Sequence, residues 1–174
     1  MPKAISAITA MIALLSASCV GFIHMAQAGD PMVTAHKAAA LAAFKAAIRK
    51  KYDLKEAAFA ADDPEPIVTQ FYAADARSVS ANDAQTYAGV DAFRRVYASV
   101  VPGATVKIES VETYVNGDAG WDWANFFVTP DDPATAPFSF MILFLWSKED
   151  GEWISKGDFY ALGKFDTSGA GSGQ

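Results

Sequence analysis

The spacing of apolar residues divides the chain into a helical first half and a strand-rich second half. Apolar positions recur every three or four residues over 34–52, which predicts an amphipathic helix. A short helical segment is expected at 54–60. A further helix follows Asp63 and Pro64, because Asp caps helices and Pro suits the first turn. The helical period returns over 89–101 and ends at a Pro-Gly pair.

Strand patterns occupy most of the remaining chain. Two short strands flank a turn at Asn82 and Asp83, at 77–81 and 85–88. Four longer strands follow, separated by segments rich in Gly, Asp, Asn and Pro: 105–115, 121–129, 138–147 and 153–162. Helices followed by an antiparallel meander predict an α+β domain over 29–165, and the Gly/Ser-rich residues 166–174 are expected to form a flexible tail.

Two neighbouring strands are apolar on both faces. Residues 138–146 read Phe-Ser-Phe-Met-Ile-Leu-Phe-Leu-Trp, and 121–128 has the same character. Antiparallel sheets usually leave one face in water, so the second apolar face needs a cover. We expect a homodimer joined through the outer sheet face; the alternative is a strand enclosed by its own curled sheet.

The first 28 residues are typical of an export signal. Lys3 precedes an apolar stretch over 4–20, and a small-x-small pattern ends at Ala28, which predicts cleavage before Gly29. The alternatives are an uncleaved membrane anchor, or lipidation at Cys19, although Ser stands three positions before that Cys where a branched apolar residue is required. We expect an exported protein, periplasmic or secreted, with no membrane attachment after cleavage.

Charge and composition exclude several kinds of chemistry. The chain has 14 Lys+Arg against 20 Asp+Glu, so a nucleic-acid groove is not expected. Beyond residue 28 there is no Cys and one His, His36, which argues against a thiol nucleophile, a metal site or a Ser-His-Asp triad. We therefore expect no metal and no cofactor. Any chemistry depends on carboxylates, tyrosines and the shape of a pocket.

Three segments stand out at the junctions of these elements: a first helix-to-strand junction, a Gly-x-x-Ala-Phe entry to a helix, and a closing Gly-x-Trp-x-Ile…Asp strand; these are Phe71–Ala76, Tyr87–Phe93 and Gly151–Tyr160. With the order of the elements, they resemble the nuclear transport factor 2-like superfamily, in its SnoaL-like and ketosteroid-isomerase-like branch. The resemblance covers Leu41 to Gly163. It implies a cone, in which a curved antiparallel sheet wraps over about three helices and leaves an apolar pocket at one end.

The comparison with ketosteroid isomerase argues against that activity. Aligned without gaps, the general-base Asp of the enzyme falls on Ser80, and its proton-donating Asp falls near Leu143. A serine hydroxyl is no base near neutral pH, and leucine donates no hydrogen bond. Asp83 would restore a carboxylate in a shifted alignment, but its place favours a turn role.

Within this resemblance, the candidate catalytic residues are Asp158 and Tyr160. In SnoaL-like members the Asp matching Asp158 often faces the pocket, where an apolar setting would raise its pKa. Tyr160 lies two residues further along the strand and shares its face. The candidate ligand-contacting side chains are Tyr72, Arg77, Tyr97, Trp121, Trp123, Phe140 and Phe144. Aromatic stripes of this kind are more often core than ligand contacts, and an ion pair with a nearby acid such as Asp75 is the commoner role for Arg77.

Three functions remain open. The first is an exported domain that binds a small apolar molecule and is built as a homodimer. The second is an acid/base enzyme of the cyclase or dehydratase kind that uses Asp158 with Tyr160. The third is a dimerisation scaffold without a ligand.

Overall fold

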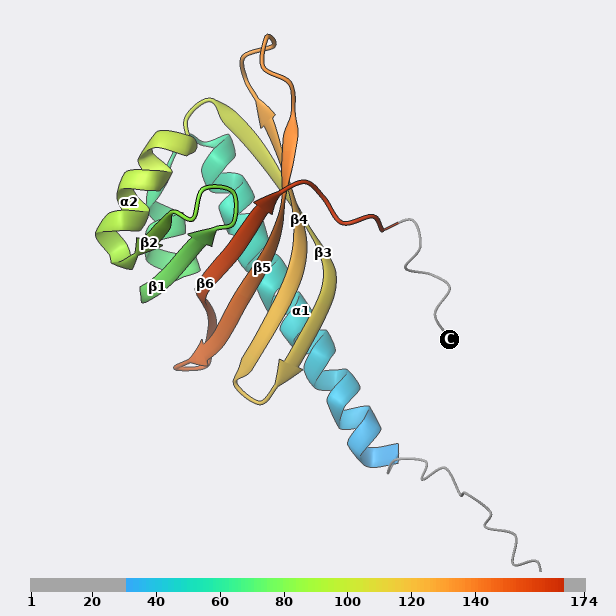
Figure 1. Ribbon diagram of the computed structural model, residues 1–174. Coiled ribbons are helices and arrows are strands. Elements are labelled where there is room, and N and C mark those ends of the chain that lie inside the picture. Colours follow the sequence, from blue (N-terminus) through green and yellow to red (C-terminus); the bar gives the residue numbers. More distant parts are fainter. Residues whose placement is uncertain (1–30, 168–174) are drawn as a thin grey trace, which may run out of the picture.

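The computed structural model describes residues 31–167. Within them the chain forms one long helix, a π-helical turn, a short hairpin, a second helix and four long strands (Figure 1). The bounds are α1 Pro31–Ala60, η1 Ile67–Phe71, β1 Tyr72–Ser80, β2 Thr86–Ala88, α2 Gly89–Val100, β3 Ala104–Asn116, β4 Ala119–Pro130, β5 Phe138–Glu149 and β6 Glu152–Leu162.

The six strands form one curved, unclosed sheet in the order β2-β1-β6-β5-β4-β3. All neighbours are antiparallel except β1 and β6, which run parallel because the chain leaves the first hairpin through α2 and returns by the meander. Register shifts occur between Tyr72 and Arg77 in β1, and between Leu145 and Trp146 in β5. Such irregularities bend strands and increase their twist, which is how this sheet curves around the helix.

Gly157 in β6 allows the closest approach between the two parallel strands. Its φ is +147°, and a Cβ at this position would lie 1.9 Å from the carbonyl oxygen of Arg77. No other residue type fits there without moving β1 away from β6. The glycine therefore holds the neighbouring Asp158 beside β1.

Helix α1 crosses one face of the sheet, and its N-terminal end extends beyond the β3–β4 hairpin (Figure 1). Residues 31–40 are exposed, whereas the second half is anchored by a buried stripe at helical spacing. The members of the stripe are Phe44, Ile48, Tyr52, Lys55 and Phe59. The fourth position is a lysine, the one charged residue of this stripe.

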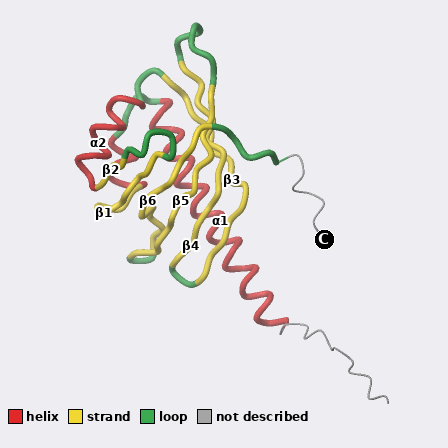
Figure 2. Tube along the Cα trace, viewed as in Figure 1, coloured by secondary structure: helices red, strands yellow, loops and turns green. Residues whose placement is uncertain are grey.

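An aromatic cluster fills the centre of the core between α1 and the sheet. Tyr52 contacts Phe144 with ring centroids 5.4 Å apart, and Phe71 contacts Trp146 at 5.3 Å. The Tyr52 hydroxyl donates a 2.7 Å hydrogen bond to Asp122, a buried carboxylate of β4. Helix α2 packs against β1 and the π-helical turn, and so covers the sheet at its β2–β1 edge (Figure 2).

The predicted fold is confirmed, and two details of it are corrected. The segments expected at 34–52 and 54–60 are one helix, because no Gly or Pro interrupts residues 32–60 and Tyr52 continues directly to buried Lys55. The first strand begins at Tyr72, not at Arg77, since the π-helical turn ends at Phe71. The four long strands lie within one to two residues of their expected bounds.

The outer face of the sheet carries the second apolar surface. In the register, Trp123 pairs with Leu143 and Leu143 with Phe159, so three neighbouring strands present these residues side by side. Residues 163–167 cross part of this face. The Phe165 ring contacts Trp123 at 5.4 Å, and the Phe165 backbone exchanges two hydrogen bonds with the buried Asn125 side chain.

Candidate functional site

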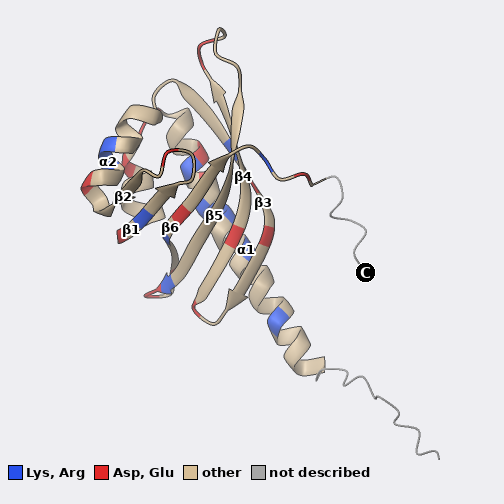
Figure 3. Cartoon of the chain, viewed as in Figure 1, with Lys and Arg blue, Asp and Glu red and all other residues tan. Residues whose placement is uncertain are grey.

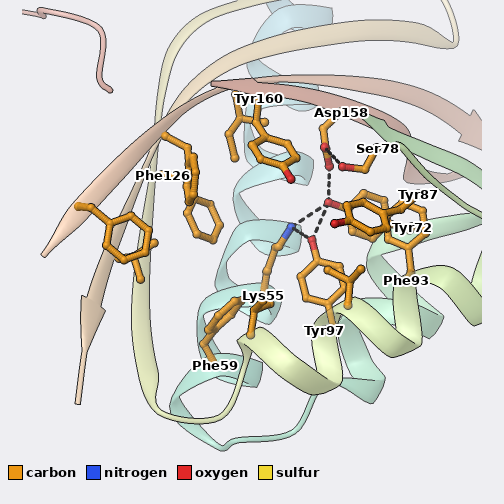
Figure 4. Close-up of a pocket in the computed structure, with 16 residues that line it drawn as sticks. Lys55, Phe59, Tyr72, Ser78, Tyr87, Phe93, Tyr97, Phe126, Asp158 and Tyr160 are labelled. Atoms are coloured by element: carbon orange, nitrogen blue, oxygen red, sulfur yellow. Dashed lines mark hydrogen bonds between the residues drawn. The ribbon is translucent and has the colours of Figure 1, made fainter. Parts of the chain in front are cut away.

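A cavity of about 220 Å³ opens between α2 and the inner face of the sheet (Figure 4). Strands β4 and β5 supply an apolar wall formed by Phe126, Val128, Phe140 and Ile142. Helix α2 supplies the facing wall, which includes Phe93, Val96 and Tyr97. Five polar side chains gather where α1, β1 and β6 meet α2: Lys55, Tyr72, Ser78, Tyr97 and Asp158. We call these five residues the polar floor.

Lys55 is the centre of the polar floor. Its side chain is 2% exposed, and its Nζ donates hydrogen bonds to the hydroxyl of Tyr72 at 2.9 Å and to that of Tyr97 at 2.8 Å. Helix α1 brings this amine inward because Lys55 continues the apolar stripe. The amine therefore reaches the cavity from below and meets hydroxyls from β1 and α2 (Figure 4).

Asp158 lies on the opposite side of the polar floor from Lys55. Its Oδ2 accepts a 2.5 Å hydrogen bond from the Tyr72 hydroxyl, and its Oδ1 accepts one of 2.5 Å from Ser78. Because Tyr72 donates to Asp158, the 2.9 Å contact between Tyr72 and Tyr97 has Tyr97 as its donor. The hydrogen bonds thus connect the amine to the carboxylate through Tyr72.

Burial shifts the pKa values of both charged groups toward neutrality. Desolvation lowers the pKa of Lys55 to about 7, and the charge of Asp158 opposes this only in part. Desolvation also raises the pKa of Asp158, against the charge of Lys55 and the hydrogen bonds of Ser78 and Tyr72. Near neutral pH the amine therefore exists in both its charged and its neutral form.

Aromatic rings surround the amine on most sides. The Nζ of Lys55 lies 4.4 Å from the ring centroid of Phe71 and 5.6 Å from that of Phe126, and the rings of Tyr72, Tyr97 and Phe144 lie between these distances. Ring faces attract an ammonium group, which offsets part of the cost of its burial. Burial also raises the pKa of Tyr72 and Tyr97 well above the usual value, so both remain hydroxyl donors.

The cavity brings together five of the nine predicted site residues. Asp158 and Tyr160 both line it, as the shared strand face requires, and so do Tyr72, Tyr97 and Phe140. Desolvation raises the pKa of Tyr160, whose hydroxyl points toward the space above Lys55 (Figure 4).

The other four predicted residues do not line this cavity. Phe144 is fully buried in the core against Tyr52. Trp121 and Trp123 lie on the outer face, because strand alternation directs their buried neighbours Asp122 and Ala124 inward. Arg77 is exposed for the same reason, one residue before inward Ser78.

The nearby carboxylate Asp75 pairs with Lys156 at 2.5 Å rather than with Arg77.

Lys55 and Ser78 were not predicted as site residues. A signal for Lys55 was present, since it stands three residues after Tyr52 and four before Phe59, on the apolar stripe. The predicted helix ends at Tyr52, so Lys55 falls outside its apolar stripe, whereas the observed helix continues to Ala60. Ser78 alternates with exposed Arg77 and carried no comparable signal, because its importance comes from pairing with Asp158 across parallel strands.

The two positions aligned with the isomerase carboxylates have different surroundings. Leu143 lies on the outer face, away from the cavity, while its neighbours Ile142 and Phe144 point inward. Ser80 is buried and lies opposite Tyr160 in the register. Asp83 accepts a hydrogen bond from the Gln85 backbone, which is the turn role expected for it.

A second buried carboxylate lies apart from the cavity. Asp122 accepts hydrogen bonds from Tyr52, Ser110 and Thr113 at 2.6 to 2.8 Å. Desolvation raises its pKa, which these three donors oppose. With both oxygens occupied inside the core, Asp122 joins α1, β3 and β4 and has no open side for a ligand.

Within residues 31–167, no cluster of three or more His, Cys, Asp or Glu side chains could hold a metal ion. In that same range, no helix is both long and apolar enough to cross a membrane. The predicted cleavage site at Ala28 and Gly29, and Cys19, lie outside the described residues.

Comparison with known proteins supplies a family. A family model described as a SnoaL-like domain matches residues 53–156, which include Lys55, Tyr72 and Tyr97 but end just before Asp158. No curated protein matches this sequence.

Solved structures share the fold at low sequence identity. An NTF2-like protein with a cystatin-like fold from Novosphingobium aromaticivorans is 15% identical with a TM-score of 0.62, over 82% of this chain and 95% of that one. LinA is 14% identical with a TM-score of 0.60, over 71% of this chain and 88% of LinA. A domain of unknown function from Nostoc punctiforme is 16% identical with a TM-score of 0.59, over 70% of this chain and 78% of that domain. Such identities show the fold alone.

The lowered pKa of Lys55 predicts how stability depends on pH. An unfolded lysine has a pKa of about 10.4, so between pH 7 and 10 the unfolded chain binds a proton that the folded protein does not bind. The free energy of unfolding should therefore rise with pH in this window, by about 3 kcal/mol between pH 7 and 9.5. Urea denaturation of the wild type and of Lys55→Met at both pH values measures it. Parallel pH profiles for the two proteins would contradict the assignment.

Proposed function

Because the chain belongs to the SnoaL-like family, with its NTF2-like cone fold, we propose that it binds a small, mainly apolar molecule in the cavity and directs one polar group of that molecule to the polar floor. The observation that carries this proposal is the asymmetry of the cavity. Its walls are mainly Phe, Val and Ile, whereas the five hydrogen-bonded groups of the polar floor converge around Lys55. Ligand sites commonly have this composition.

The size of the cavity limits the ligand. A volume of about 220 Å³ is below the range of roughly 300–1,000 Å³ that is usual for drug-sized ligands. A single ring or a medium-length aliphatic chain with one functional group suits this space. The charged form of Lys55 has three donors, two of which go to Tyr72 and Tyr97, so the matching ligand group is an acceptor oxygen.

Acid/base catalysis by Asp158 with Tyr160 is the second candidate. The buried carboxylate and its raised pKa favour it. However, both oxygens of Asp158 already accept hydrogen bonds, from Tyr72 and Ser78, so a substrate proton must reach Asp158 through one of these hydroxyls or at a remaining lone pair. Deuterium exchange at the α-carbon of 2-tetralone tests it: the exchange should be fast in the wild type and at least a hundredfold slower in Asp158→Asn.

We further propose that two copies associate through the outer sheet face. The centre of this face is Leu143, flanked by Trp123 and Phe159, and the nearby Leu145 is 47% exposed. Within β5 the charged residues Lys148 and Glu149 stand at the end of the strand (Figure 3), whereas β3 carries exposed Glu112 opposite Trp123. Apolar surface of this kind is typical of protein interfaces. The contact between Phe165 and Trp123 covers part of the face, so the chain's own residues 163–167 would border the interface.

Export is also proposed, on the pattern of residues 1–28. Helix α1 begins at Pro31, so cleavage before Gly29 would leave every described element intact. The domain would then act in the periplasm or outside the cell.

A substitution in the cavity wall tests ligand binding. Val96 lines the cavity from α2, whereas Ala98 on the same helix is exposed, so Val96→Trp fills the space and Ala98→Trp is the matched control. Isothermal titration calorimetry with acetophenone and 2-octanone should show binding to the wild type. Affinity should fall at least tenfold in Val96→Trp and stay unchanged in Ala98→Trp. No binding to the wild type, or equal loss in both variants, would contradict the proposal.

A charge on the outer face tests association. Leu145→Glu should convert a dimer to a monomer, because a carboxylate would be buried without a partner at the interface. Val33→Glu is the control, since Val33 is 51% exposed in the first turn of α1, the helix that crosses the opposite face of the sheet. Sedimentation velocity at micromolar concentration measures both. A wild type that sediments as a monomer would rule the dimer out.

A further inference from the structure

Lys55 differs from the other described lysines in having no direct carboxylate partner while being fully enclosed. Lys156, for comparison, contacts Asp75 and Glu149 within 3.1 Å at the surface. Within residues 31–167, no ion pair within 4 Å joins Lys55 to an acid, and the connection to Asp158 passes through the Tyr72 hydroxyl. A buried ion pair therefore does not account for the placement of this amine.

The surroundings of the amine suit a nucleophile. Burial among Phe71, Phe126 and Phe144 disfavours the ammonium form, so a large fraction of Lys55 carries a lone pair near neutral pH. Lysines that attack carbonyl groups in proteins are activated by such desolvation. The amine also lies at the polar end of a cavity whose walls would hold an apolar body.

We propose that Lys55 forms an imine with the carbonyl group of a small apolar aldehyde or ketone bound in the cavity. The inference rests on the proposed function, because the same cavity holds the ligand, and it names the ligand class and a covalent step at that site. The acceptor oxygen expected at the polar floor is then the carbonyl oxygen.

The step balances with groups already in place. The lone pair of neutral Lys55 Nζ forms a bond to the carbonyl carbon, and the C=O π pair moves to the oxygen, which takes up a proton. Nζ loses one proton in forming this carbinolamine and a second as the C–O bond breaks. The products are one imine and one water, with no oxidant or reductant.

Tyr72 and Asp158 form the path for these protons. The Tyr72 hydroxyl oxygen lies 2.9 Å from Lys55 Nζ and 2.5 Å from Asp158 Oδ2. The Tyr72 oxygen can therefore accept a proton from Nζ while the hydroxyl proton of Tyr72 moves to Asp158. The same pair can return it to the departing oxygen. The other titratable groups that face the cavity are Tyr97 from α2, Tyr87 from β2 and Tyr160 from β6.

Reductive trapping tests the imine directly. The folded wild-type protein is incubated at pH 7 with benzaldehyde or octanal and sodium cyanoborohydride, which reduces an imine to a stable secondary amine. Peptide mapping by mass spectrometry should find the adduct on Lys55 at least tenfold more than on Lys51, one turn earlier on α1 and partly exposed. At pH 7 roughly a thousandth or less of an ordinary lysine is neutral.

The controls separate the imine from simple binding. Lys55→Met should lose the site-specific adduct, and the wild-type map remains decisive should that variant fail to fold. Benzyl alcohol and 1-octanol match the two aldehydes without a carbonyl, and calorimetry measures their binding. If the alcohols bind but Lys55 is labelled no more than Lys51, the imine is refuted while the binding function stands. If the alcohols do not bind and Lys55 is not labelled, both are refuted.

Discussion

The enclosure of one lysine amine is the constraint on which the rest of this structure depends. An isolated charge moved from water into a protein interior costs several kcal/mol, so a buried lysine persists only with hydrogen bonds, nearby opposite charge or loss of its proton. Lys55 has all three, through Tyr72, Tyr97 and Asp158 and through a pKa near 7. Each partner comes from a different element, and Asp158 comes from the last strand. The polar floor is therefore complete only when β6 has paired with β1.

The sheet separates two surfaces with different uses. Its inner face carries the cavity wall and the polar floor, while its outer face carries the Trp123, Leu143 and Phe159 surface. Strand alternation explains how β4 and β5 serve both: Phe126 and Ile142 point inward, and their sequence neighbours point outward. The two apolar faces recognised in the sequence thus correspond to one ligand-sized cavity and one exposed surface.

The fold was predictable from the sequence because it depends on local periodicity. The strands and α2 follow from alternation and turn residues, and the inward positions of Tyr72, Tyr97 and Asp158 follow from the helix and strand periods. The polar floor was harder to predict, because it forms through contacts between residues distant in the sequence. The separation of Lys55 from Tyr97 is 42 residues, and that of Tyr72 from Asp158 is 86. A lysine on an apolar stripe was the one local sign of it. The prediction that Trp121 and Trp123 line the pocket was wrong, because the aromatic content of a strand does not determine which face of the sheet is concave.

The ionisation of Lys55 underlies both the binding site and the imine. Two-dimensional NMR of the lysine side chains, followed by pH titration with Lys55 assigned through Lys55→Met, measures it residue by residue. We expect Lys55 to titrate near pH 7, far below the pKa of about 10.4 of a free lysine side chain. If every lysine in the folded protein titrates near 10 or above, the amine is not held in its neutral form, and the central claim is wrong.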